Sequence, residues 1–302
     1  MHSSRMIGVV ASLVAVAALA AACASPSGPA CVGSVSEALR VCQGPNVVSG
    51  IDVSSYQGNV DFARVAAAGN GFVVLRLSSG QNVDTKFQAN WQAAKAAGLV
   101  RGAYQYFWPG RDPDAQVDVM VQTLKAAGYT RDDLPPVLDL ETLDGQPVAA
   151  VVAYAQHWLR RVEDELHVRP LVYTANFMSN VTQTYFSSYP LWVANYGVTC
   201  PLMPTGWTKW VFWQSSDSGR VDGVVGNVDL DTFDGTRADL LAFARGSHLV
   251  GPSDAGADVG PISDAGPRDA ALSFDAEVPP PRPKPVLPNV TRPELVPDVP
   301  CP

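Results

Sequence analysis

The chain has 302 residues, 47% of them hydrophobic and 17% charged, a composition that suits a globular core joined to less compact segments. The formal net charge of −8 argues against a nucleic-acid partner, because phosphate binding needs a basic surface. It also argues against long-range electrostatic capture of an anionic polymer, so short-range contacts would have to hold a polysaccharide.

The first 22 residues are typical of an export signal, in which Arg5 precedes an apolar, small-residue run from Met6 to Ala22. Cleavage before Cys23 would leave a cysteine for lipid modification and membrane attachment, as in bacterial lipoproteins. The lipobox is imperfect, because Ala20 stands where leucine is usual, so plain secretory cleavage stays open. We therefore expect an exported protein, either a membrane-anchored lipoprotein or a secreted or periplasmic one. No other run approaches the ~20 apolar residues of a membrane-spanning helix.

Residues 23–47 read as a short N-terminal linker. Export permits disulfides, and four further cysteines are available, Cys31, Cys42, Cys200 and Cys301. A Cys31–Cys42 pair around a short helical stretch is the first expectation, although four cysteines allow three connectivities. We expect no metal site, because the cysteines lack short paired spacing and the four histidines are scattered.

Residues 48–246 alternate strand-like and helix-like segments. The expected strands are Val48–Val53, Phe72–Leu77, Val100–Trp108, Pro136–Leu140, Leu171–Thr174, Leu191–Ala194, Trp210–Gln214 and Val228–Phe233. The expected helices are Asp61–Ala68, Asp84–Ala97, Asp112–Ala127 and Val148–Leu166. An acidic residue at or near the start of the first three can cap free N–H groups, and a glycine follows each of these helices.

Alternating strands and helices predict parallel βαβ units. Eight strands in about 200 residues predict a closed α/β barrel of TIM type, flattened, with short connections in place of the last helices. The alternative is an open doubly wound sheet, but no glycine-rich phosphate loop follows the first strand. Residues 247–302 hold 13 of the 25 prolines and read as a disordered or semi-extended low-complexity tail.

Four acids fall at the ends of expected strands, where a β/α barrel carries its active site. They are Asp52 on the first strand, Asp139 and Glu141 on the fourth, and Asp229 on the eighth. Side chains at i and i+2 of a strand point the same way, so Asp139 and Glu141 would aim together, ~6.5 Å apart along the strand. Crowding raises the pKa of one carboxyl above the ~4.3 of free glutamic acid. A protonated acid of that kind is what glycosidic cleavage requires.

Aromatic residues near the strand ends point to a sugar ligand, because aromatic faces pack against the apolar faces of sugar rings. Tyr104, Tyr173 and Trp192 are our choices for the cleft, and about half of the aromatics are expected to fill the core. The substrate-binding candidates in full are Tyr104, Tyr106, Tyr173, Trp192, Asn195, Trp213 and Gln214.

These residues together resemble glycoside hydrolase family 25, the lysozymes first known from fungi, streptomycetes and phages. The matching segments, in family order, are Gly50–Ser54 with Gln57-Gly58, Gly102–Tyr104, Pro136–Glu141, Tyr173-Thr174, Leu191–Tyr196, Trp213-Gln214 and Val228-Asp229. The resemblance covers about Val48 to Gly246. It implies a flattened barrel of eight strands and five helices.

The resemblance also implies an enzyme that hydrolyses the β-1,4 bond between N-acetylmuramic acid and N-acetylglucosamine in peptidoglycan. Glu141 would be the general acid, Asp139 would orient the acetamido group that acts as internal nucleophile, and Asp52 and Asp229 would tune this pair. No metal and no cofactor would be needed, and we expect a monomer whose partner is the glycan strand.

Two departures from the family pattern bear on substrate preference. Gln105 stands where histidine is frequent, and the second strand ends in Arg76-Leu77-Ser78-Ser79-Gly80 without the usual acid. The alternatives are a non-catalytic glycan-binding module on the same fold and another glycosidase, such as a chitinase, whose upstream acids are missing. An esterase or amidase is disfavoured, because no G-x-S-x-G elbow appears.

Overall fold

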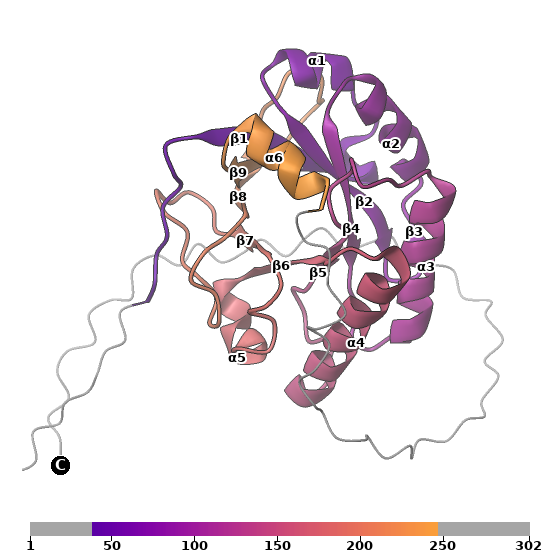
Figure 1. Cartoon of the computed structure of the whole chain (residues 1–302), viewed down its shortest axis with the longest axis vertical. Helices are drawn as coiled ribbons and strands as arrows, with labels where there is room; N and C mark the ends of the chain where they lie inside the picture. The colour runs from indigo at the N-terminus through magenta and orange to yellow at the C-terminus, as the bar shows by residue number, and fades with distance from the viewer. Residues whose placement is uncertain (1–37, 247–302) are drawn as a thin grey trace, which may run out of the picture. The chain divides into compact units, whose positions relative to one another are not determined.

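A computed structural model of the chain describes residues 38–246 (Figure 1). The expectations for the signal segment, Cys23, Cys31 and the tail from residue 247 lie outside the described residues.

Eight strands close into a barrel, as the sequence predicts. Their order around the barrel follows the chain, and β1 pairs with both β2 and β9. They are β1 (Val47–Val53), β2 (Phe72–Ser79), β4 (Val100–Tyr106), β5 (Val137–Asp139), β6 (Leu171–Ala175), β7 (Leu191–Ala194), β8 (Phe212–Gly219) and β9 (Val228–Asp234). A ninth strand, β3 (Asn82–Val83), forms a hairpin with the end of β2.

The direction of β9 differs from the all-parallel expectation. Strands β1 to β8 of the barrel run parallel, whereas β9 is antiparallel to β8 and to β1. A short hairpin-like connection from β8 reverses the chain, because no helix intervenes to carry it back. The beginning of β9, at Val228 and Asp229, therefore lies at the same end of the barrel as the ends of the parallel strands.

The four expected helices are present within three residues of their predicted ends. They are α1 (Phe62–Ala67), α2 (Phe87–Ala96), α3 (Pro113–Ala126) and α4 (Val148–Leu166). Asp61 and Asp112 cap α1 and α3 through backbone N–H groups, whereas Asp84 makes no cap of α2. Short elements complete the described chain: η1 (Ser55–Gln57), η2 (Asn176–Met178), α5 (Ser179–Thr182) and α6 (Arg237–Ala244).

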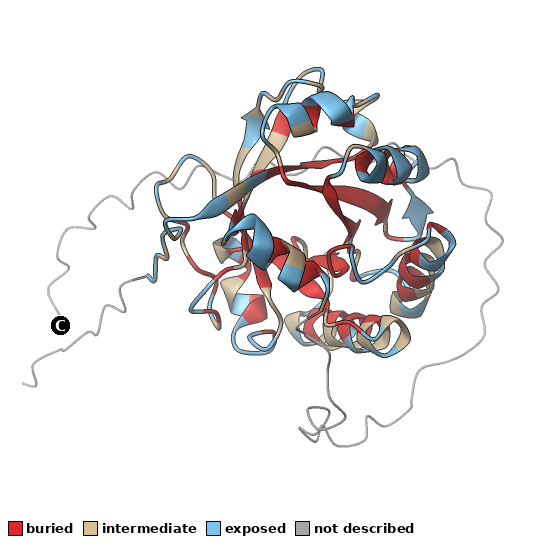
Figure 2. Cartoon of the chain, turned by 45° about the horizontal axis from the view of Figure 1, so that its top comes forward, coloured by how far each residue is buried: buried red, intermediate tan, exposed pale blue. Residues whose placement is uncertain are grey.

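The strands separate two apolar layers. Their outward side chains pack with α1 to α4 in an outer core, while inward side chains such as Phe72, Tyr104 and Phe212 fill the barrel. Helix α6 lies against β1, β8 and β9 (Figure 1), and its Phe243 packs 5.8 Å from Phe212 and 6.1 Å from Phe233. Figure 2 shows the result as a ring of buried strands inside helices whose outer faces are exposed. The barrel is thus filled and closed at one end, which leaves the opposite end for a site.

The disulfide joins Cys42 to Cys200, so the expected Cys31–Cys42 pair is wrong. The N-terminal segment runs beside the loop after β7, where Val41 N–H donates to Pro201 O (3.2 Å) and Met203 N–H donates to Leu39 O (2.8 Å). This pairing brings the two cysteines to a Cα–Cα distance of 4.3 Å. A contact between residues so far apart in sequence leaves no local spacing signal.

Candidate active site

Asp139 and Glu141 lie where β5 ends. Asp139 is its last residue, in register with Tyr106 of β4 and Tyr173 of β6, and only 1% exposed. Glu141 follows two residues later and is 6% exposed. Burial first, and then the nearby charges of Glu141, Asp139 and Asp52, raise the pKa of the Tyr173 phenol well above its ordinary value. Three of the four predicted acids therefore surround one buried hydroxyl.

Asp52 and Asp229 meet across the β1–β9 pair. They lie directly opposite each other, so their side chains share one face of the sheet. Asp231, two residues along β9, lies on the same face, is buried, and accepts a hydrogen bond from Trp192 Nε1 (3.0 Å). We did not predict Asp231, although the alternation Val228-Asp229-Leu230-Asp231 carries the signal, since a period of two places both acids on one side.

Gln214, the third residue of β8, connects Asp52 on β1 with Tyr173 on β6 and with Tyr196 after β7. Its side-chain Nε2 donates to Asp52 Oδ2, and its Oε1 accepts from the hydroxyls of Tyr173 (2.7 Å) and Tyr196 (2.6 Å). All of these groups except the Tyr196 ring are buried. The amide is thereby held in one orientation, with its donor on the Asp52 carboxylate.

The three aromatics chosen for the cleft are buried inside the barrel. Tyr104, Tyr173 and Trp192 are almost fully buried, and Trp192 contacts the other two rings edge-on at 6.3 and 4.8 Å. Little of their ring surface is left for stacking on a sugar. Tyr106 is half-buried, packs 5.0 Å from the half-buried Trp108, and stays a candidate for substrate contact.

Trp213 and Asn195 do not line the inner face. Trp213 belongs to the outer core, packs 6.0 Å from Trp210, and donates through Nε1 to the backbone oxygen of Asn195 (2.9 Å). The Asn195 side-chain oxygen accepts from Leu202 N–H (2.8 Å). These two residues support the strand ends and the loop after β7.

A buried ion pair that the sequence reasoning missed forms part of the rim. Arg76, near the end of β2, contacts Asp84 at 2.8 Å and donates to Ser55 Oγ (3.0 Å). Its guanidinium lies 4.9 Å from the ring centre of Tyr56, which is half exposed. The pair holds the turn that follows Asp52 and presents Tyr56 at the mouth of the barrel.

Two further observations concern residues 38–246. No helix among them is long and apolar enough to cross a membrane. Nor do they contain a group of three or more histidine, cysteine or acidic side chains that is arranged to hold a metal ion.

Comparison with known proteins gives consistent matches. Residues 51–224 match the family described as glycosyl hydrolases family 25. The chain is 36% identical over 206 residues to the uncharacterized protein YegX of Escherichia coli K12, covering 66% of this chain and 74% of that protein. It is 35% identical over 214 residues to Lysozyme M1 of Streptomyces globisporus, with 66% and 71% covered. Among solved structures, the bacterial lysozyme from Streptomyces coelicolor aligns with a TM-score of 0.61 at 34% identity, covering 66% of this chain and 97% of that one.

Proposed function

The chain belongs to glycoside hydrolase family 25, and from that premise we propose that it hydrolyses the β-1,4 bond between N-acetylmuramic acid and N-acetylglucosamine in peptidoglycan. The observation that carries this proposal is the pair Asp139 and Glu141, buried at the open end of the barrel with Asp52 beside the same phenol. A lysozyme needs such carboxylates within reach of one glycosidic bond.

In the mechanism that we propose, Glu141 donates its proton to the glycosidic oxygen as the bond to C1 of the muramic acid breaks. The acetamido oxygen of the same sugar attacks C1, and Asp139 accepts a hydrogen bond from the acetamido N–H to orient it. Water then attacks C1 and opens the ring that the acetamido group has formed, and the proton that the water loses returns to Glu141. Glu141 is thereby protonated again for the next cycle. No redox partner is required, because every bond change is a proton transfer or a substitution at C1.

Asp52 and Asp229 have a supporting role in this proposal. Asp52 is buried and held in place by the Gln214 amide. This arrangement suits a carboxylate that influences the neighbouring acids electrostatically and does not itself transfer a proton. Asp229 lies opposite it and is half-buried, so we propose that it contacts the substrate.

The test uses the full chain with purified peptidoglycan and identifies new reducing ends by mass spectrometry. Glu141→Gln and Asp139→Asn should abolish muramic acid ends, while Asp164→Asn, at an exposed acid on α4, should release them like the wild type. New reducing ends on glucosamine would contradict the proposed specificity and would indicate another glycosidase. Pelleting with the wall without any new ends would indicate a binding module.

The role of the chain ends is a separate proposal, since they lie outside the described residues. We propose that residues 1–22 direct export and that Cys23 is lipid-modified. We further propose a monomer in which residues 48–246 form the catalytic unit. Cys23→Ser should move the protein from the membrane fraction to the soluble fraction. An unchanged distribution would favour plain secretory cleavage.

A further inference from the structure

The end of β4 and the loop that follows it carry two aromatic rings and a cation in mutual contact. Tyr106 ends β4 in register with Asp139, and its ring lies 5.0 Å from the ring of Trp108. The guanidinium of Arg111 in turn lies 5.1 Å from the centre of the Trp108 ring. This series of side chains therefore begins on the strand beside Asp139, at the open end of the barrel. The proposed reaction at C1 uses none of the three.

Trp108 is held in one position by hydrogen bonds and by packing. Its Nε1 donates to Ser79 Oγ (2.9 Å), and its backbone N–H donates to Gln116 Oε1 (3.0 Å). Gln116 Nε2 donates in return to Trp108 O (3.0 Å). Gly80, with φ of 58°, lies against the ring, since a Cβ at this position would come to 3.0 Å from Trp108 Cδ1 and 3.4 Å from Arg111 Nη1. A half-buried ring that is already fixed loses little conformational entropy when a ligand packs against it.

Arg111 is exposed, and its positive charge is not neutralised by an ion pair. The ion pairs formed among residues 38–246 do not include it. Two acids contact the same loop through backbone groups instead. The Asp112 carboxylate accepts from Asp114 N–H (2.9 Å), and the Asp144 carboxylate accepts from Gly110 N–H (3.0 Å). A guanidinium that lies over an aromatic ring and has no carboxylate partner within the fold can bind the carboxylate of a ligand.

The charges around the open end of the barrel make such a cation useful. The whole chain carries a net charge of −8, and the four predicted acids add negative charge at this end, which disfavours a ligand that bears carboxylates. Arg76, the arginine of the rim described above, is paired with Asp84. In peptidoglycan the lactyl group of N-acetylmuramic acid either ends in a carboxylate or continues into a peptide stem with carboxylates of its own. Arg111 can offset the repulsion where one of these groups comes near.

We propose that Arg111 is a specificity-determining residue that binds a carboxylate of the lactyl or peptide substituent of muramic acid, with the Trp108 ring packed against the apolar part of the same substituent. The proposal rests on the proposed muramidase activity and names the substituted form of the glycan that the site prefers. Arg111 contacts substrate without taking part in proton transfer, so its removal should raise KM and leave kcat unchanged.

The first test compares Arg111→Gln with Arg160→Gln on soluble, uncross-linked glycan strands that carry peptide stems. Arg160 is a matched control, because it is an exposed arginine on α4 and its substitution changes the net charge equally. We expect Arg111→Gln to lower kcat/KM for release of muramic acid ends about fivefold, through KM and with an unchanged Tm. Arg160→Gln should match the wild type. Arg111→Lys should recover most of the loss because it keeps the charge, and high salt should reduce the loss.

The same strands treated with an amidase distinguish the two sources of the carboxylate, because removal of the stem leaves a free lactyl carboxylate. A loss for Arg111→Gln that is confined to stem-bearing strands assigns the site to the peptide stem, and an equal loss on stripped strands assigns it to the lactyl group. If the wild type is active but Arg111→Gln matches Arg160→Gln on both substrates, or lowers kcat without raising KM, the site is overturned and the muramidase activity stands.

Binding to the Glu141→Gln variant gives a readout that does not depend on catalysis. In this background, titration calorimetry with stem-bearing strands should show a Kd about fivefold higher after Arg111→Gln and unchanged after Arg160→Gln. An equal Kd for the two double variants overturns the site. If the wild type releases no muramic acid ends while the Kd depends on Arg111, the proposed function falls and the carboxylate site stands.

Discussion

At the scale of single residues, Gln214 is the group that orients the buried Asp52 carboxylate. It donates to Asp52 and accepts from two phenols, so one amide satisfies three polar side chains. Gln214→Met keeps the length of the side chain and removes all three bonds. Loss of a donor to a buried carboxylate costs roughly 1–3 kcal/mol, so we expect kcat to fall tenfold or more.

The control is Tyr196→Phe, which removes only one of the two hydroxyls that donate to Gln214. Steady-state release of reducing ends should show a smaller loss for this variant than for Gln214→Met. A kcat for Gln214→Met equal to that of the wild type would contradict the positioning role.

Gln105, which replaces a frequent histidine of the family, turns out to lie on the outer face of β4. Its Nε2 contacts Ser78 Oγ (2.7 Å) and the backbone oxygens of Gly80 (3.0 Å) and Gln116 (2.9 Å), while Oε1 accepts from Trp158 Nε1 (2.6 Å). The side chain is fully buried and links the barrel to α3 and α4. This departure from the family therefore concerns stability rather than substrate choice.

Gln105→Leu should test that assignment. It leaves several buried polar groups without their partner, which we expect to lower the free energy of unfolding by ~2–4 kcal/mol. Denaturant unfolding measures this loss, and Ser78→Ala, which removes one of the bonds, should cost less. At a temperature where the variant is folded, kcat should equal that of the wild type, and a parallel loss of kcat would show that residue 105 acts on the site.

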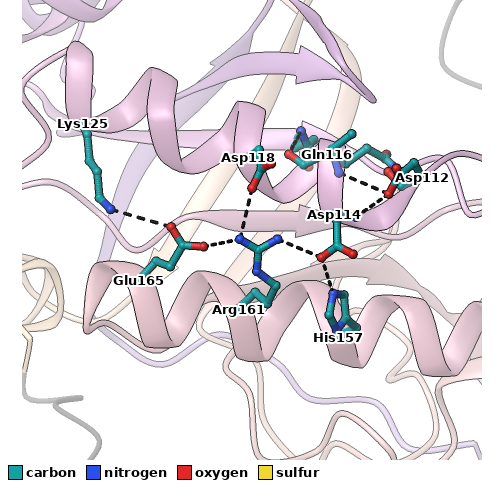
Figure 3. Close-up of polar contacts among 10 residues, drawn as sticks. Asp112, Asp114, Gln116, Asp118, Lys125, His157, Arg161 and Glu165 are labelled. Carbon is teal, nitrogen blue, oxygen red and sulfur yellow. Dashed lines mark hydrogen bonds and ion pairs between the residues drawn. The ribbon is translucent and has the colours of Figure 1, made fainter. Parts of the chain in front are cut away.

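At the scale of elements, α3 and α4 are joined by a surface ion network centred on Arg161 (Figure 3). Arg161 contacts Asp114 (2.8 Å), Asp118 (3.1 Å) and Glu165, and His157 also contacts Asp114 (2.7 Å). The hydrogen bonds from His157 and then Arg161 lower the pKa of Asp114. Because the pKa of Asp114 is lower in the folded state, its ionised form stabilises the fold at pH values above its pKa in the unfolded chain, about 3.9. This stabilisation is lost as the pH falls through the pKa of Asp114 in the folded state.

Arg161→Met should therefore lower Tm at pH 7 and make little difference once the pH lies below the lowered folded-state pKa of Asp114, where Asp114 is protonated in both states. The gap in Tm between the variant and the wild type should also narrow at high salt, since the pairs are partly exposed. Lys125→Met is the control, because Lys125 reaches the network only at 3.8 Å from Glu165. A gap in Tm that is independent of pH would assign the effect of Arg161 to packing.

The long helices and the order of strands are what the sequence predicts best, for local physical reasons. Helix α3 begins at an Asp112 cap and ends before a glycine with positive φ at residue 128, and both signals are local. The direction of β9 carries no such signal, because an alternating pattern reads the same way in either direction. Helix α6 was not predicted, because its eight residues show little amphipathic periodicity, and it covers the end of the barrel opposite the site.

At the scale of the whole molecule, barrel closure explains which site residues sequence reasoning finds. Asp52 and Asp229 are predicted neighbours because the first and last strands must meet, and the β1–β9 register places them opposite each other. Their hydrogen-bond partners depend on side-chain packing between strands and loops distant in sequence. For the same reason the predicted cleft aromatics Tyr104 and Trp192 are buried inside the barrel. The alternation along a strand predicts the face on which a side chain lies, but not how deeply it is buried.

The Cys42–Cys200 disulfide acts at this same scale, because it closes a loop with a sequence separation of 158 residues around most of the barrel. A cross-link of that span stabilises mainly by restricting the unfolded chain, by ~2–5 kcal/mol. The folded contacts that flank it do not require the bond. Trp210 Nε1, for example, donates to Val41 O (2.7 Å), and Arg40 Nη1 donates to Cys200 O (2.9 Å).

The double variant Cys42→Ser with Cys200→Ser should therefore unfold at lower denaturant concentration, with kcat unchanged at low temperature, because neither cysteine lines the site. Wild-type protein reduced with dithiothreitol is the matched control and should have the same unfolding midpoint as the double variant. If the double variant instead loses activity while it is still folded, the N-terminal segment positions the loop after β7, and with it the strand ends that hold Asn195 and Gln214. Equal midpoints for the oxidised wild type and the double variant would contradict a stabilising role for the disulfide.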